Sequence, residues 1–293
     1  MSLPFRLKLA KQNAEAFLTK EGITALPVDP FAIAAGRGIV VEPKPESVDG
    51  VSGMLLRHGE TYGILYATHV PNEGFQRFSV AHELGHYFTD GHLDHVLKDG
   101  GVHSSHAGFV SADPYEMEAD SFAAGLLMPS GLFKRAIGRR DPGLAAIEAT
   151  ATTCRTSLTA TAIRYAELTS DAIAVVMSTG STIDYCILSD AMKSLPELTW
   201  PKKGSPVPKD TETARMNADS NRILLAEHAE SEIDVMDWLG GTKSATVNEE
   251  VVGLGRYGKT LTILSSAAIG QDDAADPDDE QEMLDRWTPT FRR

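Results

Sequence analysis

The chain has 293 residues, with 42% hydrophobic and 23% charged side chains, as in globular proteins and unlike disordered ones. Its formal net charge of -14 argues against broad, nonspecific binding of nucleic acid or anionic membranes by the whole surface. Eight acidic side chains and no Lys or Arg lie in residues 271–285, so we expect residues 269–293 to be a disordered acidic tail.

The N-terminal residues mix charged with apolar side chains and contain no unbroken apolar stretch, so we expect no signal peptide. No segment approaches the roughly 18 consecutive apolar residues of a membrane span. Cys154 and Cys186 are the two cysteines, few for a secreted chain of this length, and we interpret both as thiols in a reducing compartment. The sequence therefore predicts a cytoplasmic protein without membrane contact.

The first elements in chain order are helices and short strands. Apolar side chains at helical spacing predict a helix over residues 5–20, and Asp29 can cap a second helix in VDPFAIAAG. GIVVEP predicts a strand, and VSGMLLRHGETYGILYAT predicts two strands joined near residues 58–60. Asn72 can cap the next helix, EGFQRFSVAHELGHYF.

The second half of the chain changes from helices to strands. Residues 89–114 show little periodicity and are expected to form a long loop, and the helix YEMEADSFAAGLLM follows and ends before Pro129. Two further helices are expected between residues 141 and 168. AIAVVMST and TIDYCILS then predict a hairpin, and a mixed section ends in the strand TLTILSS.

The segment HELGH predicts a metal site. Residues four apart on a helix lie on one face, so His82 and His86 can present two imidazoles to one ion. Glu83 points about 100° around the helix, where it can reach a metal-bound water without binding the metal itself. Zinc lowers the pKa of such a water to about 7, and the carboxylate can take its proton during attack on a carbonyl.

A third protein ligand is expected from the helix that follows. Glu116 and Asp120 in YEMEAD have the spacing of a ligand and of an acid that accepts the free ring N–H of a ligand histidine. Glu118 and His92 remain alternative third ligands. His92 is less favoured because Thr89 stands where the extended histidine pattern normally has a glycine.

Other polar side chains near the motif are candidates for contacts with substrate. His103 and His106 in the expected loop, or Tyr115, can donate a hydrogen bond to a developing oxyanion. The sequence does not choose among them. His95 and its neighbours in the loop also leave open a second metal ion, although exposed histidines or substrate contacts are favoured.

RFSVAHELGHYF and EMEADSFAAGLLMP resemble the ImmA/IrrE family of metallo-endopeptidases, over about residues 5–170. The resemblance implies a zincin-like peptidase domain in which His82, His86 and Glu116 hold Zn²⁺, with Mn²⁺ as the alternative, and Glu83 is the catalytic base. It also implies a protein substrate, a helix-turn-helix repressor, whose cleavage derepresses genes of a stress or DNA-damage response or of a mobile element.

We therefore predict an α+β chain that begins with a small mixed sheet and the HExxH helix and continues with helix-turn-helix-like helices and a mixed α/β part. The radiation-response branch of the family adds a GAF-like sensor domain, which would take a small-molecule signal. The expected segments are a zincin-like metallopeptidase domain at 1–130, a helix-turn-helix-like region at 131–170, a GAF-like domain at 171–268 and the acidic tail at 269–293.

Residues 131–168 carry six basic and three acidic side chains, as a DNA-binding segment can. Arg164 is nearly the only side chain on the would-be recognition helix that can read base edges. We therefore favour a structural or substrate-docking helix pair over a DNA reader.

Two functions remain open. The first is a zinc-dependent endopeptidase that makes limited cuts in a regulatory protein. VSGMLL as an edge strand could pair with an extended substrate peptide, and we give equal weight to its being merely half of a small sheet. The second is a non-catalytic transcriptional regulator or antitoxin-like module with a structural metal site. Glu83 separates the two, because a structural site needs no base.

Overall fold

The computed structural model describes residues 2–45, 50–98, 101–106 and 113–266. The chain divides into two compact units, residues 1–140 with 146–165, and residues 141–145 with 166–293. The expected acidic tail, 269–293, lies outside the described residues, and the domain boundaries stay a prediction. Among the residues that can be placed, none of the helices has both the length and the apolar character needed to span a bilayer.

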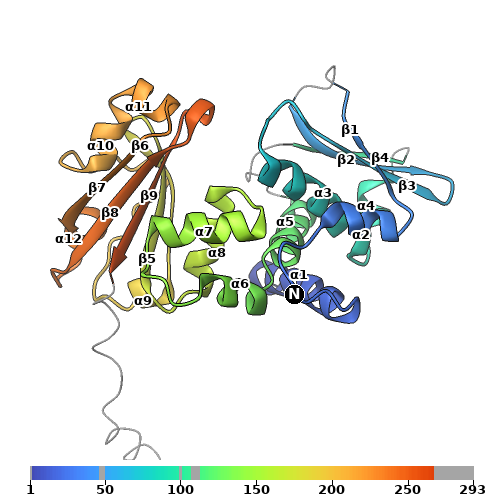
Figure 1. The fold of residues 1–293 in the computed structure, drawn as a ribbon, viewed down its shortest axis with the longest axis horizontal. Coiled ribbons are helices and arrows are strands. Elements are labelled where there is room, and N and C mark those ends of the chain that lie inside the picture. The colour runs from blue at the N-terminus through green and yellow to red at the C-terminus, as the bar shows by residue number, and fades with distance from the viewer. Residues whose placement is uncertain (1, 46–49, 99–100, 107–112, 267–293) are drawn as a thin grey trace, which may run out of the picture. The chain divides into compact units, whose positions relative to one another are not determined.

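The N-terminal unit combines helices with a small sheet (Figure 1). Its elements, with the helices that link it to the second unit, are α1 (Leu3–Lys20), α2 (Pro30–Gly36), β1 (Val40–Pro43), β2 (Val51–His58), β3 (Thr61–Tyr66), α3 (Glu73–Phe88), α4 (His92–Val96), β4 (Val102–His106), α5 (Pro114–Leu127), α6 (Ser130–Ile137), α7 (Leu144–Cys154) and α8 (Leu158–Leu168).

The four strands of this sheet lie in the order β1-β3-β2-β4. β2 is antiparallel to both of its neighbours, whereas β1 is parallel to β3. The expectation that VSGMLL offers a free strand edge is wrong, because β2 is an interior strand. Its outer neighbour is β4, which pairs Leu55 with His103 and Gly53 with Ser105.

The prediction of a long loop over residues 89–114 is also wrong for part of this segment. The structure places the short helix α4 and the strand β4 there. Five residues of VHSSH give no apolar alternation that a sequence pattern would detect. The segment forms a strand because its backbone pairs with β2. The side chains of VHSSH do not indicate this tertiary interaction.

Helices α1, α3 and α5 lie together on one side of the sheet (Figure 1). Glycines let their backbones approach closely. A Cβ atom on Gly125 of α5 would lie 2.7 Å from the carbonyl oxygen of Lys11 in α1. A Cβ atom on Gly85 of α3 would lie 3.0 Å from the Cα atom of Ala119 in α5. α5 is therefore held between the helix that carries HELGH and the N-terminal helix.

Arg164 on α8 is buried in the first unit. Its guanidinium donates hydrogen bonds to the Met128 carbonyl, at 3.0 Å, and to the Ser130 hydroxyl, at 3.0 Å. It also pairs with the Glu15 carboxylate of α1, at 3.1 Å. This side chain is used inside the unit, which supports the structural interpretation of this helix and leaves the DNA-reading role untested.

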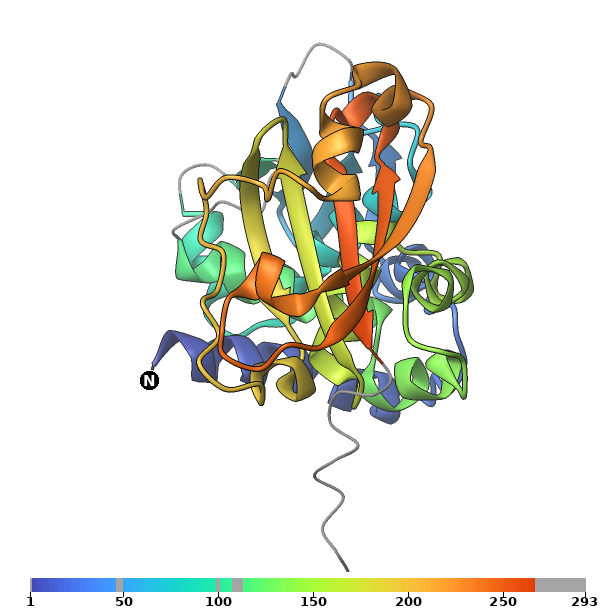
Figure 2. The ribbon, with the colours of Figure 1, turned by 90° about the vertical axis from the view of Figure 1, so that its left-hand side faces the viewer.

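The second unit contains a five-stranded antiparallel sheet in the order β6-β5-β9-β8-β7, seen face-on in Figure 2. One of its cores is built around Val176, Leu264 and Trp238, and a smaller one around Met216 and Val251. Its elements are β5 (Ala172–Thr179), β6 (Thr182–Leu188), α9 (Asp190–Lys193), α10 (Glu212–Asn217), α11 (Ser220–Leu224), β7 (His228–Asp234), α12 (Val235–Leu239), β8 (Thr246–Gly253), η1 (Gly255–Tyr257) and β9 (Thr260–Ser266).

The expected hairpin is β5 and β6, but sequence patterns missed β7 and β8. β8 begins with polar residues, so no apolar alternation marks it as a strand in the sequence. One of these polar residues, Glu249, is nevertheless fully buried. The Glu249 carboxylate accepts hydrogen bonds from the backbone N–H groups of Glu212 and Thr213, at the start of α10, and from the Ser231 hydroxyl. A buried acid satisfied by a helix terminus looks, in sequence, like a surface residue.

We expect Gly125→Ala to destabilise the protein by about 1–3 kcal/mol, as overpacking of a closed contact does, although alanine favours helix formation. Gly36→Ala is the matched control. It lies at the end of α2 with nothing within 4 Å of the added Cβ, and should stabilise by about 0.4–1 kcal/mol. Urea unfolding midpoints measure both. Equal stabilisation by the two alanines would contradict the tight α1–α5 contact.

Candidate metal centre

Helix α3 presents the two histidines of HELGH on one buried face. Asn72 caps the helix by accepting a hydrogen bond from the Phe75 N–H, at 2.9 Å. His82 and His86 follow near its C-terminal end, 5% and 0% exposed. Their Nε2 atoms face each other across 3.1 Å. The two imidazoles therefore point at one place, as the four-residue spacing predicts.

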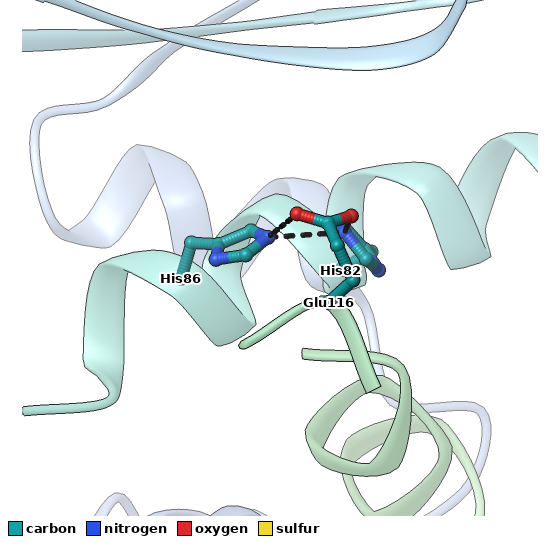
Figure 3. A group of neighbouring side chains, drawn as sticks. All are labelled: His82, His86 and Glu116. Carbon is teal, nitrogen blue, oxygen red and sulfur yellow. Dashed lines mark hydrogen bonds and ion pairs between the residues drawn. The ribbon is translucent and has the colours of Figure 1, made fainter. Parts of the chain in front are cut away.

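Helix α5 brings a carboxylate to the same place. Asp113 caps it through the Tyr115 N–H, so Glu116 stands in the first turn. Figure 3 shows the Glu116 carboxylate between the two imidazoles. Its Oε2 atom lies 3.3 Å from His82 Nε2, and its Oε1 atom lies 3.3 Å from His86 Nε2.

The ligand atoms of His82, His86 and Glu116 all lie within 4.8 Å of one another, so the three residues can hold one metal ion. Two imidazole nitrogens and one carboxylate oxygen are a donor set that catalytic zinc sites use, with a fourth position left for water or substrate. The residues present therefore fit a zinc ion. The group alone does not set the identity of the metal.

The protonation of these groups follows from their surroundings. Burial opposes ionisation of Glu116, but hydrogen bonds with His103, His82 and His86 hold its pKa well below its usual range. Burial lowers the pKa of His86 to about 4, which leaves a neutral imidazole. Burial opposes the charged form of His82, but Asp120 and Glu116 raise its pKa to about 10, so a metal ion would displace a proton from it.

Glu83 is fully buried, and neither carboxylate oxygen has a hydrogen-bond partner among the residues that the structure describes. Burial raises its pKa, and the nearby His82, His103 and Ser105 hydroxyl oppose this. Gly53 of β2 makes room for it, since a Cβ atom there would lie 2.5 Å from Glu83 Oε1. The fold thus keeps an unpaired carboxyl group beside the two histidines.

Strand β4 adds His103 to this group. Because side chains alternate along a strand, His103 and Ser105 share a face, opposite Leu55 and Gly53 of β2. His103 Nε2 lies 3.0 Å from Glu116 Oε1 and 3.2 Å from the Ser105 hydroxyl. His103 is therefore brought to the centre, as a residue that contacts substrate there would be.

The two alternative third ligands lie one layer further back. His92 Nδ1 faces His86 Nδ1 at 3.2 Å, on the far side of that ring, and His92 Nε2 lies 2.9 Å from Glu118 Oε2. Neither belongs to the group that can hold the ion. Asp120 Oδ1 lies 2.8 Å from His82 Nδ1, the position expected of an acid that fixes a ligand histidine.

The remaining candidates are more distant from the centre. Tyr115 stacks on His95, with ring centroids 3.8 Å apart, and meets His92 edge-on at 5.0 Å. Its ring therefore belongs to the layer behind His86. His106 is at the exposed end of β4 and is not among the residues that face Glu116.

Sequence reasoning missed three residues of this region. Gly53 and Ser105 lie on strands whose register brings them beside Glu83 and His103. Arg6 of α1 reaches the Glu118 carboxylate. The two-residue spacing of His103 and Ser105, which puts both on one face if the segment is a strand, is the one signal that could have linked them. Nothing in the sequence links Arg6 to the motif.

Removal of Glu116 should weaken zinc binding by about 100-fold or more, because a site of four ligands binds with about 10–16 kcal/mol, or roughly 3 kcal/mol for each ligand. We propose Glu116→Ala, with zinc affinity measured by competition with a chromophoric chelator. Glu73→Gln, an exposed change on α3, is the control and should bind as wild type does. Unchanged affinity in Glu116→Ala would remove this residue from the ligand set.

Comparison with known proteins adds a family and a fold. Among solved structures, the chain is similar to a Mycobacterium tuberculosis transcriptional regulator, with 12% sequence identity and a TM-score of 0.55, covering 88% of this chain and 76% of that one. At this identity the likeness concerns the fold alone. A search of curated proteins found no match.

Residues 34–164 match the family model of the IrrE N-terminal-like domain, a peptidase family. The matched range includes the strands β1–β4, the helix with HELGH, and Glu116. Residues 34–164 of this chain are therefore an IrrE N-terminal-like domain of the M78 peptidase family.

Proposed function

We propose that this protein is a metal-dependent endopeptidase that makes limited cuts in a regulatory protein. The observation that carries the proposal is Glu83, a fully buried carboxyl group without a hydrogen-bond partner among the described residues, beside the three residues that can hold a metal ion. An unsatisfied buried polar group costs on the order of 1–3 kcal/mol. A site with a purely structural role would have no use for it.

The chain's own residues suit peptide hydrolysis. Zn²⁺ held by His82, His86 and Glu116 would act as a Lewis acid that activates water and polarises a carbonyl oxygen. Glu83 would take the proton of the attacking water and pass it to the leaving amine. Burial raises the pKa of Glu83, which makes it a stronger base for this proton than an exposed carboxylate.

The sheet offers a place for the substrate. β4 lies at one end of the strand order, and its His103 faces Glu116. An extended peptide that pairs with such a strand would have its backbone fixed by main-chain hydrogen bonds. His103 would then donate a hydrogen bond to the oxygen of the peptide bond that is cut. Among the described strands β4 is at an edge of the sheet, so we propose that the substrate pairs with β4 rather than with the interior β2.

The substrate class is a helix-turn-helix repressor, whose cleavage would derepress genes in a stress response, a DNA-damage response or a mobile element. The resemblance to ImmA/IrrE endopeptidases supports this class. The matched IrrE N-terminal-like domain and the structural likeness to a protein named a transcriptional regulator agree with a role in transcription. The cytoplasm, where repressors act, is the proposed location.

The second unit is proposed as a GAF-like domain that receives a small-molecule signal. Its five strands form one antiparallel sheet, and the assignment as GAF-like rests on the resemblance to the radiation-response branch of the family. Binding of DNA by α6–α8 is not favoured, since Arg164 is buried.

A non-catalytic transcriptional regulator or antitoxin-like module is the alternative, favoured by the name of the structural neighbour. In that case the metal would only stabilise the fold. Glu83 could then be replaced without loss of function, so one variant separates the two functions.

We expect Glu83→Gln to reduce cleavage at least about 100-fold, as loss of a general base does, while zinc content stays at that of wild type. New protein N-termini are compared in cells that express wild type or Glu83→Gln. A few N-termini found only with wild type, above all within a helix-turn-helix repressor, would identify the enzyme and its substrate together. Full biological function of the Gln variant would favour the non-catalytic regulator.

Gly53→Ala should impair the same step by a different route. The added Cβ would lie 2.5 Å from Glu83 Oε1, so the carboxylate has to move. We expect kcat on the identified substrate to fall, with zinc affinity within about twofold of wild type. Gly63→Ala on β3 is the control, since its nearest contact would be an ordinary 3.7 Å. Normal kcat in Gly53→Ala would show that the position of Glu83 does not matter.

A further inference from the structure

A line of hydrogen bonds leads from His86 away from the metal-facing side to helix α1. His86 Nδ1 lies 3.2 Å from His92 Nδ1, and His92 Nε2 lies 2.9 Å from Glu118 Oε2. Arg6 Nη2 donates to the same oxygen at 2.9 Å, and Arg6 Nε pairs with Glu118 Oε1. His86 and His92 are 0% and 1% exposed, so water does not compete for these contacts.

The chemistry of Arg6 and Glu118 sets the direction of every hydrogen bond in this line. A guanidinium only donates, and the two-pronged pair keeps Glu118 as a carboxylate, which only accepts. His92 must therefore carry its proton on Nε2. The Nδ1 atom of a neutral His92 is then an acceptor, and the facing Nδ1 of His86 has to be the donor.

This order of protons leaves the lone pair of His86 on Nε2, the atom that faces Glu116 and His82. A histidine can ligate a metal only through an unprotonated nitrogen. His82 obtains the same result by a direct contact, since its Nδ1 lies 2.8 Å from Asp120 Oδ1. The two histidines thus use different supports, one a single carboxylate and the other a line of three side chains.

We propose that Arg6, Glu118 and His92 form a positioning relay that fixes the tautomer and ring orientation of His86 for metal binding. Helix α1 lies outside residues 34–164, the range matched by the peptidase family. The relay therefore makes an element outside that range part of the metal centre. This inference rests on the proposed metal-dependent function, and none of its three residues belongs to the group that can hold the ion.

The first test needs no substitution. In full-length protein with ¹⁵N-labelled histidine, long-range ¹H–¹⁵N spectra at pH 7.5 report which ring nitrogen carries the proton. The relay requires His92 to be protonated on Nε2, both in metal-depleted protein and after addition of zinc, and His86 to be protonated on Nδ1 in the zinc-loaded form. His92 protonated on Nδ1 instead would overturn the relay.

The second test is zinc affinity, measured by chelator competition. Loss of a group that orients a ligand histidine typically weakens metal binding by about 10–100-fold. We expect that range for His92→Ala, and about tenfold for Glu118→Gln and Arg6→Ala. Adding Glu118→Gln to His92→Ala should cause little further loss, because both act through His86.

Two matched controls share the helices of the relay. Asp94→Asn removes an exposed charge from α4, and Lys8→Ala removes an exposed positive charge from α1; both should bind zinc within twofold of wild type. Circular dichroism confirms that each variant is folded, and Arg6→Lys replaces Arg6→Ala if the latter is not. A folded His92→Ala that binds zinc as tightly as wild type would overturn the relay.

Failure of the relay can be told from failure of the proposed function. Wild-type protein that binds no zinc would contradict the metal-dependent function itself. The tautomer of His92 in metal-depleted protein would still show whether the relay exists. Wild-type protein that binds and cleaves, with His92→Ala unchanged in affinity, would leave the function intact and remove the relay.

Discussion

The close approach of α5 to α3 is the constraint on which the metal centre depends. Gly85 lies inside the HELGH motif, and a Cβ atom there would lie 3.0 Å from the Cα atom of Ala119. Because the two helices touch through these small residues, Glu116 at the start of α5 lies between His82 and His86. A larger residue at either contact would move the carboxylate away from the imidazoles.

The centre also contains a group that the fold does not satisfy. Glu83 is held without a hydrogen-bond partner among the described residues, in a space that exists because Gly53 has no side chain. Such an arrangement lowers stability, and proteins tend to keep it where chemistry needs a reactive group. The neighbouring His82, by contrast, has Asp120 as a partner, with 2.8 Å between Nδ1 and Oδ1.

Helix α1 links the metal centre to the remainder of the first unit. At one end Arg6 holds Glu118, which pairs with His92. Further along, Glu15 accepts hydrogen bonds from Ser130 and pairs with Arg164 of α8. The two carboxylate–guanidinium contacts join segments that are more than a hundred residues apart in sequence, so α1 is tied to α5 by one contact and to α8 by the other.

The sequence by itself determined the helix of HELGH, its Asn72 cap and the α+β character, because helical spacing and capping are local properties. The sequence also favoured Glu116 as the third metal ligand. It could not exclude Glu118 or His92, because all three follow His86 at a spacing at which a third ligand can occur. Only the tertiary structure separates them, because the packing of α5 against α3 brings Glu116, and neither Glu118 nor His92, into the group that could hold an ion. Strand β4, Gly53 and Arg6 were likewise beyond prediction, because pairing and helix contacts between distant segments leave no local periodicity.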